Sequence, residues 1–440
     1  MNRQFFIHSY SSRRKRKKKL FRLRYLLLAL VIYGGWHFFF SGESEDAHRG
    51  GGKTAGEIEA PAGPEPSAAN AALFRAGVRP LAKSDLVHID ENLIRARNLT
   101  IDWDLQQYLA EMGARYKLYY GSLAVIDAGT GAILALYGQT PTGQDCSLGL
   151  DTEPAASIFK VVTATAAMDQ AGFTDQSVFF YTGNAHTLYK SQLSNKRNRW
   201  CDDISLGEAF ARSNNVVFGK LGTIYLGQAP IFLTAKRLGF WKSPLKEFTS
   251  EQSTSFLPRD EYNLAELACG FNKQTRMSPL HAAQILTPVL NRGAMVTPRI
   301  VASSPVEKVQ AMRVETASRL GSMMQMTVRS GTVAKTFRGV GSDRVMKHLD
   351  IGGKSGSIDG DDPAGRRSWF AGYAVNRDTG QGIAVGCCLI LKDHFLIEAH
   401  TLTRLVMRHY FSNQPTGGPA VGALPARNSP SARSRGQRRT

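Results

Sequence analysis

The spacing of hydrophobic and polar positions changes several times along this 440-residue chain. Residues 25–40 form an apolar stretch without charged side chains, directly after a basic block at residues 13–24. A membrane span usually needs ~20 residues, and residues 20–24 can extend this one because arginine side chains reach the lipid surface. The basic flank before the stretch and the acidic flank after it predict an N-terminal transmembrane helix with its amino end in the cytoplasm. A cleaved signal peptide is the alternative. We favour a retained anchor because no small-residue cleavage site directly follows Phe40.

Period-two alternation indicates strands early and late in the rest of the chain. Residues 121–137 alternate around a turn at residues 128–131 and predict a β-hairpin. Further strand-like runs lie between residues 351 and 391, and the run 395–411 is amphipathic, whereas residues 157–297 have mostly helical spacing. Strands at both ends with helices between them predict an α+β fold, in which helices flank one central antiparallel sheet.

Composition divides the chain into five segments. Glycine, alanine, glutamate and proline without periodicity indicate a flexible linker before the folded part, and proline, glycine, serine and arginine dominate after it. The predicted segments are a basic cytoplasmic tail (1–24), a transmembrane anchor (25–40), a flexible linker and lead-in (41–97), one large domain (98–411) and a disordered basic tail (412–440).

Charge and cysteine usage limit the classes of partner and cofactor. The formal net charge of +19 is concentrated near the two ends of the chain. A nucleic-acid-binding face would spread basic side chains among aromatic ones within the domain, so we expect a membrane surface and no nucleic acid as partner. The cysteines form no CxxC pair and the histidines no HExxH spacing, so we expect no metal or other cofactor.

The cysteines themselves suggest two further features. A disulfide between Cys146 and Cys201 is one hypothesis. The odd number of cysteines and the unknown distance between these two argue against treating it as more than a hypothesis. Cys387 and Cys388 are neighbours in a strand-like run, so we expect them to point to opposite faces of the sheet as small apolar residues.

A serine and a lysine three residues apart, Ser157 and Lys160, precede an apolar helical run that should end at Ala171–Gly172. Residues with this spacing share one face of a helix, and a buried lysine with a lowered pKa can take a proton from serine without a histidine. The spacing alone is weak, because Ser12–Lys15 and Ser243–Lys246 share it. Taken alone, Ser157 is better interpreted as an ordinary helix N-cap.

Two more short motifs follow in order, Ser213-Asn214-Asn215 and Lys354-Ser355-Gly356, and each pattern occurs once in the chain. Alone, the first would be a polar turn and the second a loop with a solvated lysine. Together with Ser157-x-x-Lys160 they match the serine–lysine, serine–x–asparagine and lysine–threonine–glycine motifs of penicillin-binding proteins and class A β-lactamases. The chain therefore resembles the transpeptidase domain of a penicillin-binding protein over roughly residues 98–411.

Flanking residues support this resemblance, and a few positions depart from it. Matching flanks are Asp104-Leu105-Gln106, residues 131–135, 211–215 and 277–283, Gly331-Thr332 and Trp369–Tyr373. The family often has Pro-Gly before the nucleophile, where this chain has Ala155-Ala156, and threonines are frequent at Ser355 and Ser357. The hydroxyl groups are retained, so we expect activity. The stretch between the anchor and residue 98 is too short for a glycosyltransferase domain, which favours a compact, monofunctional, class B-like form.

The resemblance implies a role for each motif residue. Ser157 would be the nucleophile, Lys160 its base and Ser213 a proton relay. Lys354 would supply positive charge that attracts a substrate carboxylate and keeps Lys160 neutral by repulsion. Backbone N–H groups of Ser157 and Ser357 would form the oxyanion hole. The substrate-binding residues would be Asn215, Ser355, Gly356 and Ser357, with Gly356 leaving room for substrate along the strand edge. Trp369 and Phe370 are expected in the core.

The function implied is that of a membrane-anchored peptidoglycan DD-transpeptidase, a serine-type D-Ala-D-Ala enzyme that cross-links stem peptides through an acyl-enzyme. Its catalytic domain would face the periplasm or cell exterior from a single-pass anchor in the cytoplasmic membrane. β-Lactams would be its inhibitors, and a membrane glycan polymerase is a candidate partner. The alternatives are a DD-carboxypeptidase, a serine β-lactamase or β-lactam sensor, and a catalytically inert wall-synthesis scaffold.

Overall fold

The computed structural model describes residues 79–392 and 395–414. The predicted cytoplasmic tail (1–24), the anchor (25–40), the linker up to residue 78 and the C-terminal tail from residue 415 lie outside the described residues. Within the described part, no single helix has the length and apolar composition needed to cross a membrane, and one sharply bent pair, Asn215–Leu226 with Gln228–Arg237, meets both requirements jointly.

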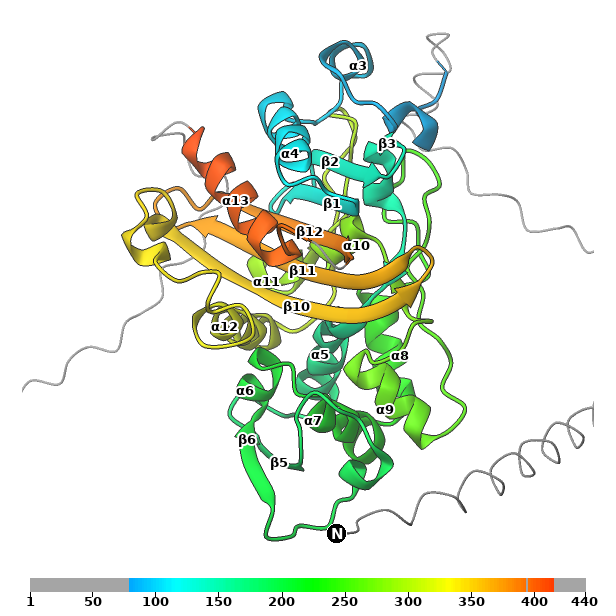
Figure 1. Ribbon diagram of the computed structural model, residues 1–440, viewed down its shortest axis with the longest axis vertical. Coiled ribbons are helices and arrows are strands. Elements are labelled where there is room, and N and C mark those ends of the chain that lie inside the picture. Colours follow the sequence, from blue (N-terminus) through cyan, green and yellow to red (C-terminus); the bar gives the residue numbers. More distant parts are fainter. Residues whose placement is uncertain (1–78, 393–394, 415–440) are drawn as a thin grey trace, which may run out of the picture. The chain divides into compact units, whose positions relative to one another are not determined.

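A six-stranded antiparallel sheet forms the centre of this region, as the sequence predicted (Figure 1). The predicted early hairpin is confirmed, and the last strand of the sequence pairs with the first, with Val125 opposite Val385. In spatial order the strands are β10 (Leu349–Asp361), β11 (Ala364–Asn376), β12 (Gly382–Leu391), β1 (Tyr120–Asp127), β2 (Ile133–Thr140) and β3 (Gly143–Gln144). Strand β10 is therefore an edge strand, which leaves backbone groups on one side for other partners.

Helices cover both faces of the sheet (Figure 1). Helices α4 (Trp103–Arg115) and α13 (Ala399–Ser412) pack on one face, and α10 (Pro279–Gln284) and α12 (Val314–Arg329) pack on the other. Two separate hydrophobic clusters result, because alternate residues of each strand point to opposite faces. The adjacent Cys387 and Cys388 belong to different clusters, which confirms the expectation that they point to opposite faces.

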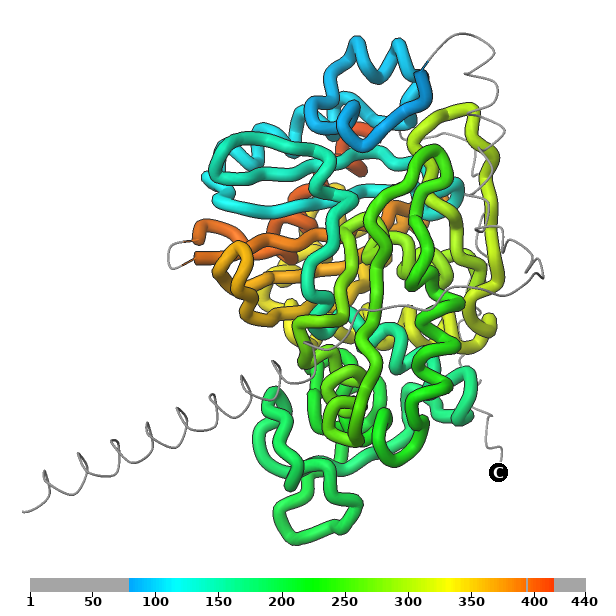
Figure 2. The backbone as a smooth tube through the Cα atoms, turned by 90° about the vertical axis from the view of Figure 1, so that its right-hand side faces the viewer, coloured from blue at the N-terminus to red at the C-terminus, as the bar shows by residue number. Residues whose placement is uncertain are grey.

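The helical region below the sheet contains a hairpin that the sequence pattern did not predict. Strands β5 (Val178–Thr182) and β6 (Cys201–Ser205) pair within the stretch expected to be mostly helical. Among their residues only Phe179 and Ile204 are buried, so the alternation is too short and too weak to be recognised. Residues 183–200 connect the two strands and extend from one end of this region (Figure 2).

The remaining elements are short or belong to the helical region. The helices are α3 (Glu91–Arg97), α5 (Lys160–Gln170), α6 (Leu206–Ala211), α7 (Asn215–Lys220), α8 (Gln228–Arg237), α9 (Glu261–Cys269) and α11 (Thr287–Leu290), and the strands are β4 (Glu153–Pro154), β7 (Arg276–Met277), β8 (Ala294–Val296) and β9 (Lys308–Gln310). There are 3₁₀ turns at Lys83–Leu86, Cys146–Leu150, Ala156–Phe159, Lys190–Leu193, Val340–Ser342 and Met346–His348, and a π-helix at Leu221–Leu226.

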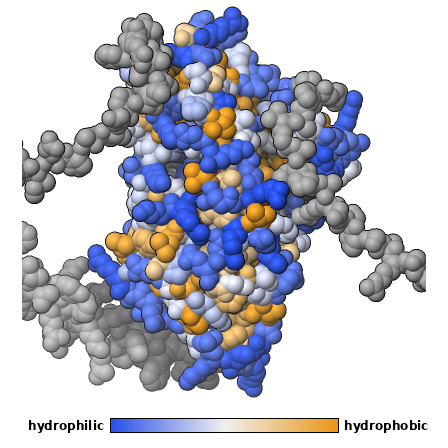
Figure 3. Space-filling model, turned by 180° about the vertical axis from the view of Figure 1, so that it is seen from behind, coloured by the Kyte–Doolittle hydropathy of each residue, from blue (hydrophilic) through white to orange (hydrophobic). Residues whose placement is uncertain are grey.

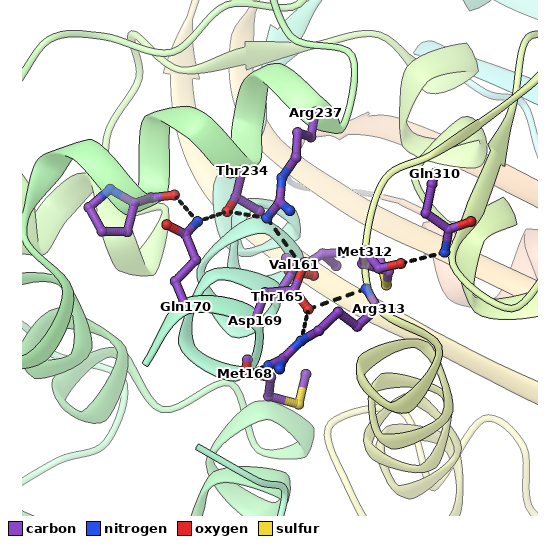
Figure 4. Close-up of polar contacts among 11 residues, drawn as sticks. Val161, Thr165, Met168, Asp169, Gln170, Thr234, Arg237, Gln310, Met312 and Arg313 are labelled. Atoms are coloured by element: carbon purple, nitrogen blue, oxygen red, sulfur yellow. Dashed lines mark hydrogen bonds and ion pairs between the residues drawn. The ribbon is translucent and has the colours of Figure 1, made fainter. Parts of the chain in front are cut away.

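Helix α5 belongs to the helical region, and its first nine residues are buried. It ends at Ala171–Gly172, as predicted. Its last turn is held by Asp169, whose side chain is 2% exposed and pairs with Arg237 at 3.2 Å and Arg313 at 3.3 Å (Figure 4). Loss of either arginine would leave a buried carboxylate without its full set of partners, which is energetically costly. These contacts therefore hold α5, whose first residue is Lys160, in place.

The proposed disulfide between Cys146 and Cys201 is wrong, since all five cysteines lie in the described residues and are free thiols. Cys146 is buried beside strand β2, where its sulfur accepts hydrogen bonds from the side-chain amides of Gln106 and Gln144. Cys201 instead begins β6 in the separate hairpin and interacts with Asn198. The two thiols therefore belong to different parts of the fold.

The surface seen in Figure 3 mixes hydrophilic areas with small hydrophobic patches. Exposed large apolar side chains such as Val178, Trp200 and Leu257 come from segments far apart in sequence. Scattered apolar side chains are usual on folded proteins, so these residues by themselves do not indicate a binding surface.

Candidate active site

Three segments that are distant in sequence meet at the edge of the sheet. Ser157 lies on the 3₁₀ turn Ala156–Phe159, Ser213 and Asn215 lie at the junction of α6 and α7, and the third motif lies on edge strand β10. A cleft of about 340 Å³ is lined by Ser157, Ser213, Asn215, Ser355, Gly356 and Ser357 among others. Lys160 and Lys354 are fully buried beside it and contact Ser157 and Ser213. The structure thus brings all the predicted site residues together.

The other serine–lysine pairs do not share this setting. Ser12–Lys15 lies outside the described residues. Ser243 donates to the Leu245 carbonyl, and Lys246 pairs with Glu307 instead of with the serine. Only the Ser157–Lys160 pair, among the described residues, lies in the cleft with the other two motifs.

The amine of Lys160 has three close partners. Its Nζ lies 2.7 Å from Ser157 Oγ, 2.8 Å from Asn215 Oδ1 and 2.7 Å from the Cys269 carbonyl oxygen. The last two groups can only accept hydrogen bonds. A neutral amine has two N–H donors and one lone pair, so both donors are used by these acceptors. The lone pair then faces Ser157, whose hydroxyl can donate to it.

Burial supports the neutral form of Lys160. The side chain is 0% exposed, and burial lowers its pKa from 10.5 to about 8. The charge of Lys354 is not a cause of this lowering, which differs from the sequence-based expectation. Repulsion acts on the other lysine: burial first, and then the charge of Lys160, hold the pKa of Lys354 well below its usual value. Desolvation is thus the dominant effect at both amines.

Lys354 lies behind the cleft and is not one of its lining residues. Its Nζ donates to Ser213 Oγ at 2.9 Å and to the Ser355 carbonyl at 2.7 Å. Lys354 therefore has no exposed surface with which to touch a substrate carboxylate, and the attraction expected from sequence would act from behind the cleft wall. Its influence on the cleft passes through Ser213, which is 8% exposed, and through the backbone of Ser355.

His186, which the sequence did not single out, orients the second motif. Its carbonyl oxygen accepts a hydrogen bond from Asn215 Nδ2 at 2.8 Å, which leaves Asn215 Oδ1 for Lys160. Its side chain lines the cleft and hydrogen-bonds to the backbone of Ser213. Burial, followed by the charges of Lys160 and Lys354, lowers the pKa of His186. The residue belongs to the connection between β5 and β6, where an isolated histidine carries no motif signal.

The turn that carries the nucleophile is strained and tightly packed. Ala156 has φ +48°, a left-handed conformation that costs a non-glycine residue about 1–2 kcal/mol. A Cβ atom on Gly270 would lie 2.0 Å from the Ala156 carbonyl oxygen, and one on Gly356 would lie 3.2 Å from Ser157 N. The two glycines therefore make room for this turn. Gly356 was expected to leave space for substrate, whereas Gly270 was not singled out because it resembles an ordinary helix stop after α9.

Strand β11 fixes the same turn from the sheet side. Trp369 Nε1 donates to the Pro154 carbonyl at 2.8 Å, and Arg367 pairs with Glu153 at 3.0 Å. Trp369 and Phe370 are 0% exposed, which confirms that they are core residues. Strand β4, just before Ser157, is therefore held against the sheet by buried polar contacts.

Comparison with known proteins agrees with this fold. The family model of the penicillin binding protein transpeptidase domain matches residues 121–388. No curated protein sequence matches the chain. The solved structure of PBPA from Mycobacterium tuberculosis is 21% identical, with a TM-score of 0.55, over 71% of this chain and 81% of that chain. A structure of the same protein as a ceftriaxone acyl-enzyme complex is 20% identical, with a TM-score of 0.55, over 78% and 82%.

A third similar structure is the D,D-transpeptidase domain of a peptidoglycan glycosyltransferase from Eggerthella lenta. It is 20% identical, with a TM-score of 0.56, over 76% of this chain and 91% of that chain. At these identities the structural similarity concerns the fold. The family model, however, covers more than half of the sequence. This chain therefore belongs to the family of penicillin-binding protein transpeptidase domains.

Proposed function

We propose that this protein is a membrane-anchored peptidoglycan DD-transpeptidase that cross-links stem peptides through a serine acyl-enzyme. The observation that carries the proposal is the position of Lys160 Nζ, 2.7 Å from Ser157 Oγ, with Asn215 Oδ1 and the Cys269 carbonyl as acceptors for the two N–H groups of a neutral amine. Family membership and the acyl-enzyme described for the similar M. tuberculosis protein support it.

In the acylation step, Ser157 Oγ attacks the carbonyl carbon of the penultimate D-alanine while its proton passes to Lys160 Nζ. Backbone N–H groups of Ser157 and Ser357 would stabilise the negative oxygen. The close approach of Gly356 to Ser157 supports this pairing. The tetrahedral intermediate then collapses and breaks the peptide bond to the terminal D-alanine.

The leaving amine takes a proton from Ser213 Oγ, and Lys354 Nζ, 2.9 Å away, restores it. Asn215, Ser355 and Ser357 line the cleft and are the groups we assign to the peptide amides and the terminal carboxylate. An amine of a second stem peptide then attacks the ester carbon. It gives a proton to Ser213 Oγ, which returns one to Lys354 Nζ. Protonated Lys160 gives its proton back to Ser157 Oγ as the ester bond breaks, so both lysines regain their starting state.

Anchoring and location are part of the proposal and rest on the sequence pattern of residues 1–40. The apolar stretch at residues 25–40 would hold the catalytic domain on the outer side of the cytoplasmic membrane. There its partners would be stem peptides, with β-lactams as inhibitors. A membrane glycan polymerase remains the candidate protein partner.

Labelling with a fluorescent penicillin tests the acyl-enzyme. We expect wild type to form a covalent adduct, Ser157→Ala to form none, and Ser243→Ala to label like wild type. The third variant is a matched control, because Ser243 shares the spacing to a lysine but lies outside the cleft. Equal labelling of wild type and Ser157→Ala, or no labelling of wild type, would refute the proposal.

Two further measurements separate the remaining functions. A label that persists for many minutes excludes a β-lactamase, because that enzyme must hydrolyse its acyl-enzyme quickly. A donor peptide supplied with an amine acceptor should give the cross-linked product. Release of the shortened donor alone would indicate a carboxypeptidase. Labelling without turnover of peptide would indicate a β-lactam sensor or a scaffold.

A further inference from the structure

The cleft continues past the motif residues to a group of charged side chains. Arg366 on β11 and Glu398 and His400 at the start of α13 line the same cleft as Ser157. Arg366 Nη2 lies 2.9 Å from Glu398 Oε1, and His400 Nε2 lies 2.5 Å from Glu398 Oε2. None of these residues belongs to the three motifs.

Contacts to the wall of the cleft hold this group in place. His400 Nδ1 lies 2.9 Å from Thr336 Oγ1, and the Ala399 N–H donates to Ser368 Oγ at 3.3 Å. The side chains of Glu398 and His400 are 32% and 19% exposed, whereas that of Arg366 is 45% exposed. The arginine is therefore the member of the group most accessible to a ligand.

Strand register orders the positions along the cleft. Strand β10 passes Ser355, Ser357 and Asp359 in turn, and Ser368 and Arg366 of β11 stand opposite the last two. With the terminal carboxylate of the donor near Ser355 and its acyl carbon at Ser157, the preceding donor residues run toward Asp359. The two strand residues from Ser357 to Asp359 span about 7 Å, which corresponds to one or two residues of an extended peptide.

The chemistry at that position suits a side chain that ends in a carboxylate and an amine. Both carboxylate oxygens of Glu398 already have partners, but a guanidinium has five N–H donors and Arg366 directs one nitrogen to Glu398. Free donors remain for a planar carboxylate, the group that arginine binds best. The exposed carboxylate of Asp359, opposite Arg366 in register, can accept from an amine. A second cavity of about 540 Å³, lined by both residues, gives room for such a group.

We propose that Arg366, held by Glu398 and His400, binds a carboxylate on the side chain of the donor-peptide residue one or two places before the acyl-forming residue. This inference rests on the proposed transpeptidase function and names the donor side chain that the site selects. It makes Arg366 a specificity residue, because the side chain contacts substrate away from the reacting atoms.

Two donor peptides that differ by one carboxylate test the proposal with the full-length protein. Both end in D-alanyl-D-alanine, preceded by diaminopimelate in one and by lysine in the other. We expect wild type to release D-alanine from the diaminopimelate peptide with about tenfold higher kcat/KM, since a charge-assisted contact of this kind is worth about one order of magnitude. Arg366→Gln should reduce this preference to nearly one.

A fluorescent penicillin has no side-chain carboxylate for Arg366 to bind, so it should still acylate Arg366→Gln. This labelling shows that the variant is folded and that its Ser157 is reactive. Arg377→Gln is the matched control. Arg377 also forms an exposed ion pair, with Asp350, but at the opposite end of β11, and its replacement should leave the preference unchanged.

Three outcomes would overturn the proposal. They are equal peptide preference in wild type and Arg366→Gln, loss of preference in Arg377→Gln, and loss of penicillin acylation in Arg366→Gln. A wild type that penicillin does not label would instead refute the proposed function itself. The two failures are therefore distinguishable.

Discussion

Replacing Asn215 with aspartate places a carboxylate where an amide oxygen now lies 2.8 Å from Lys160 Nζ. At this separation two unit charges interact by about 6 kcal/mol at an effective dielectric constant of 20, which corresponds to about four pKa units. The amide already accepts a hydrogen bond from the amine, so the net rise in the pKa of Lys160 should be about two to four units. The base would then stay protonated until strongly alkaline pH.

The wild-type reference follows from the lowered pKa of Lys160, about 8. If acylation requires the neutral amine, the rate should rise about tenfold from pH 7 to pH 9 and then level off. In Asn215→Asp the rate at pH 8 should be at least about fiftyfold lower, and it should still be rising at pH 10. Asn215→Ala removes the same amide without adding charge, so its rate should fall while the midpoint stays near that of the wild type.

The assay is the second-order rate of acylation by a fluorescent penicillin, measured with the purified full-length protein from pH 6 to pH 10. The difference in midpoint between the aspartate and alanine variants isolates the effect of charge from loss of a substrate contact. A flat wild-type profile, or one midpoint shared by both variants, would show that Lys160 is not the base.

Three other substitutions test burial and packing. The pKa of Lys160 is lower in the folded state than in the unfolded state, so the wild type loses stability as pH falls from 10.5 toward 8. Lys160→Met should therefore be more stable than the wild type by up to about 3 kcal/mol at pH 7. In urea unfolding this difference in the free energy of unfolding should shrink toward pH 10, and a constant difference would show that burial is not the cause. Gly270→Ala adds strain at φ +73° and a clash with the Ala156 carbonyl, so its free energy of unfolding should fall by about 3 kcal/mol and most penicillin labelling should be lost. Gly172→Ala is the control, because Gly172 has a similar φ but open space around it. Its free energy of unfolding should fall by about 1 kcal/mol, and it should be labelled normally. Ala156→Gly relieves about 1–2 kcal/mol of strain, but it loses a buried methyl group and adds entropy to the unfolded chain. The free energy of unfolding should therefore change by less than about 1 kcal/mol with labelling retained, and a loss of about 2 kcal/mol or more would contradict this reasoning.

Several features could be predicted from the sequence because they depend on local patterns. Period-two alternation identified the β1–β2 hairpin and the late strands, and the strand position of Cys387 and Cys388 predicted that they face opposite sides. Asp102 precedes α4, and its side chain accepts from the Leu105 N–H, as is usual for an aspartate at a helix N-cap. The short hairpin β5–β6 was missed, since two buried residues do not make a recognisable alternation.

By itself the sequence determined the α+β sheet and named the three motifs that line the cleft, since spacing and order are properties of the chain. Only the tertiary structure decided how those residues work. The pKa of Lys160 depends on burial, the direction of its lone pair depends on Asn215 and Cys269, and the turn at Ala156 depends on Gly270. These contacts join segments that are far apart in the sequence and share no motif that would show that they meet. The same is true of Arg366, Glu398 and His400, which meet because β11 and α13 pack together at one end of the cleft.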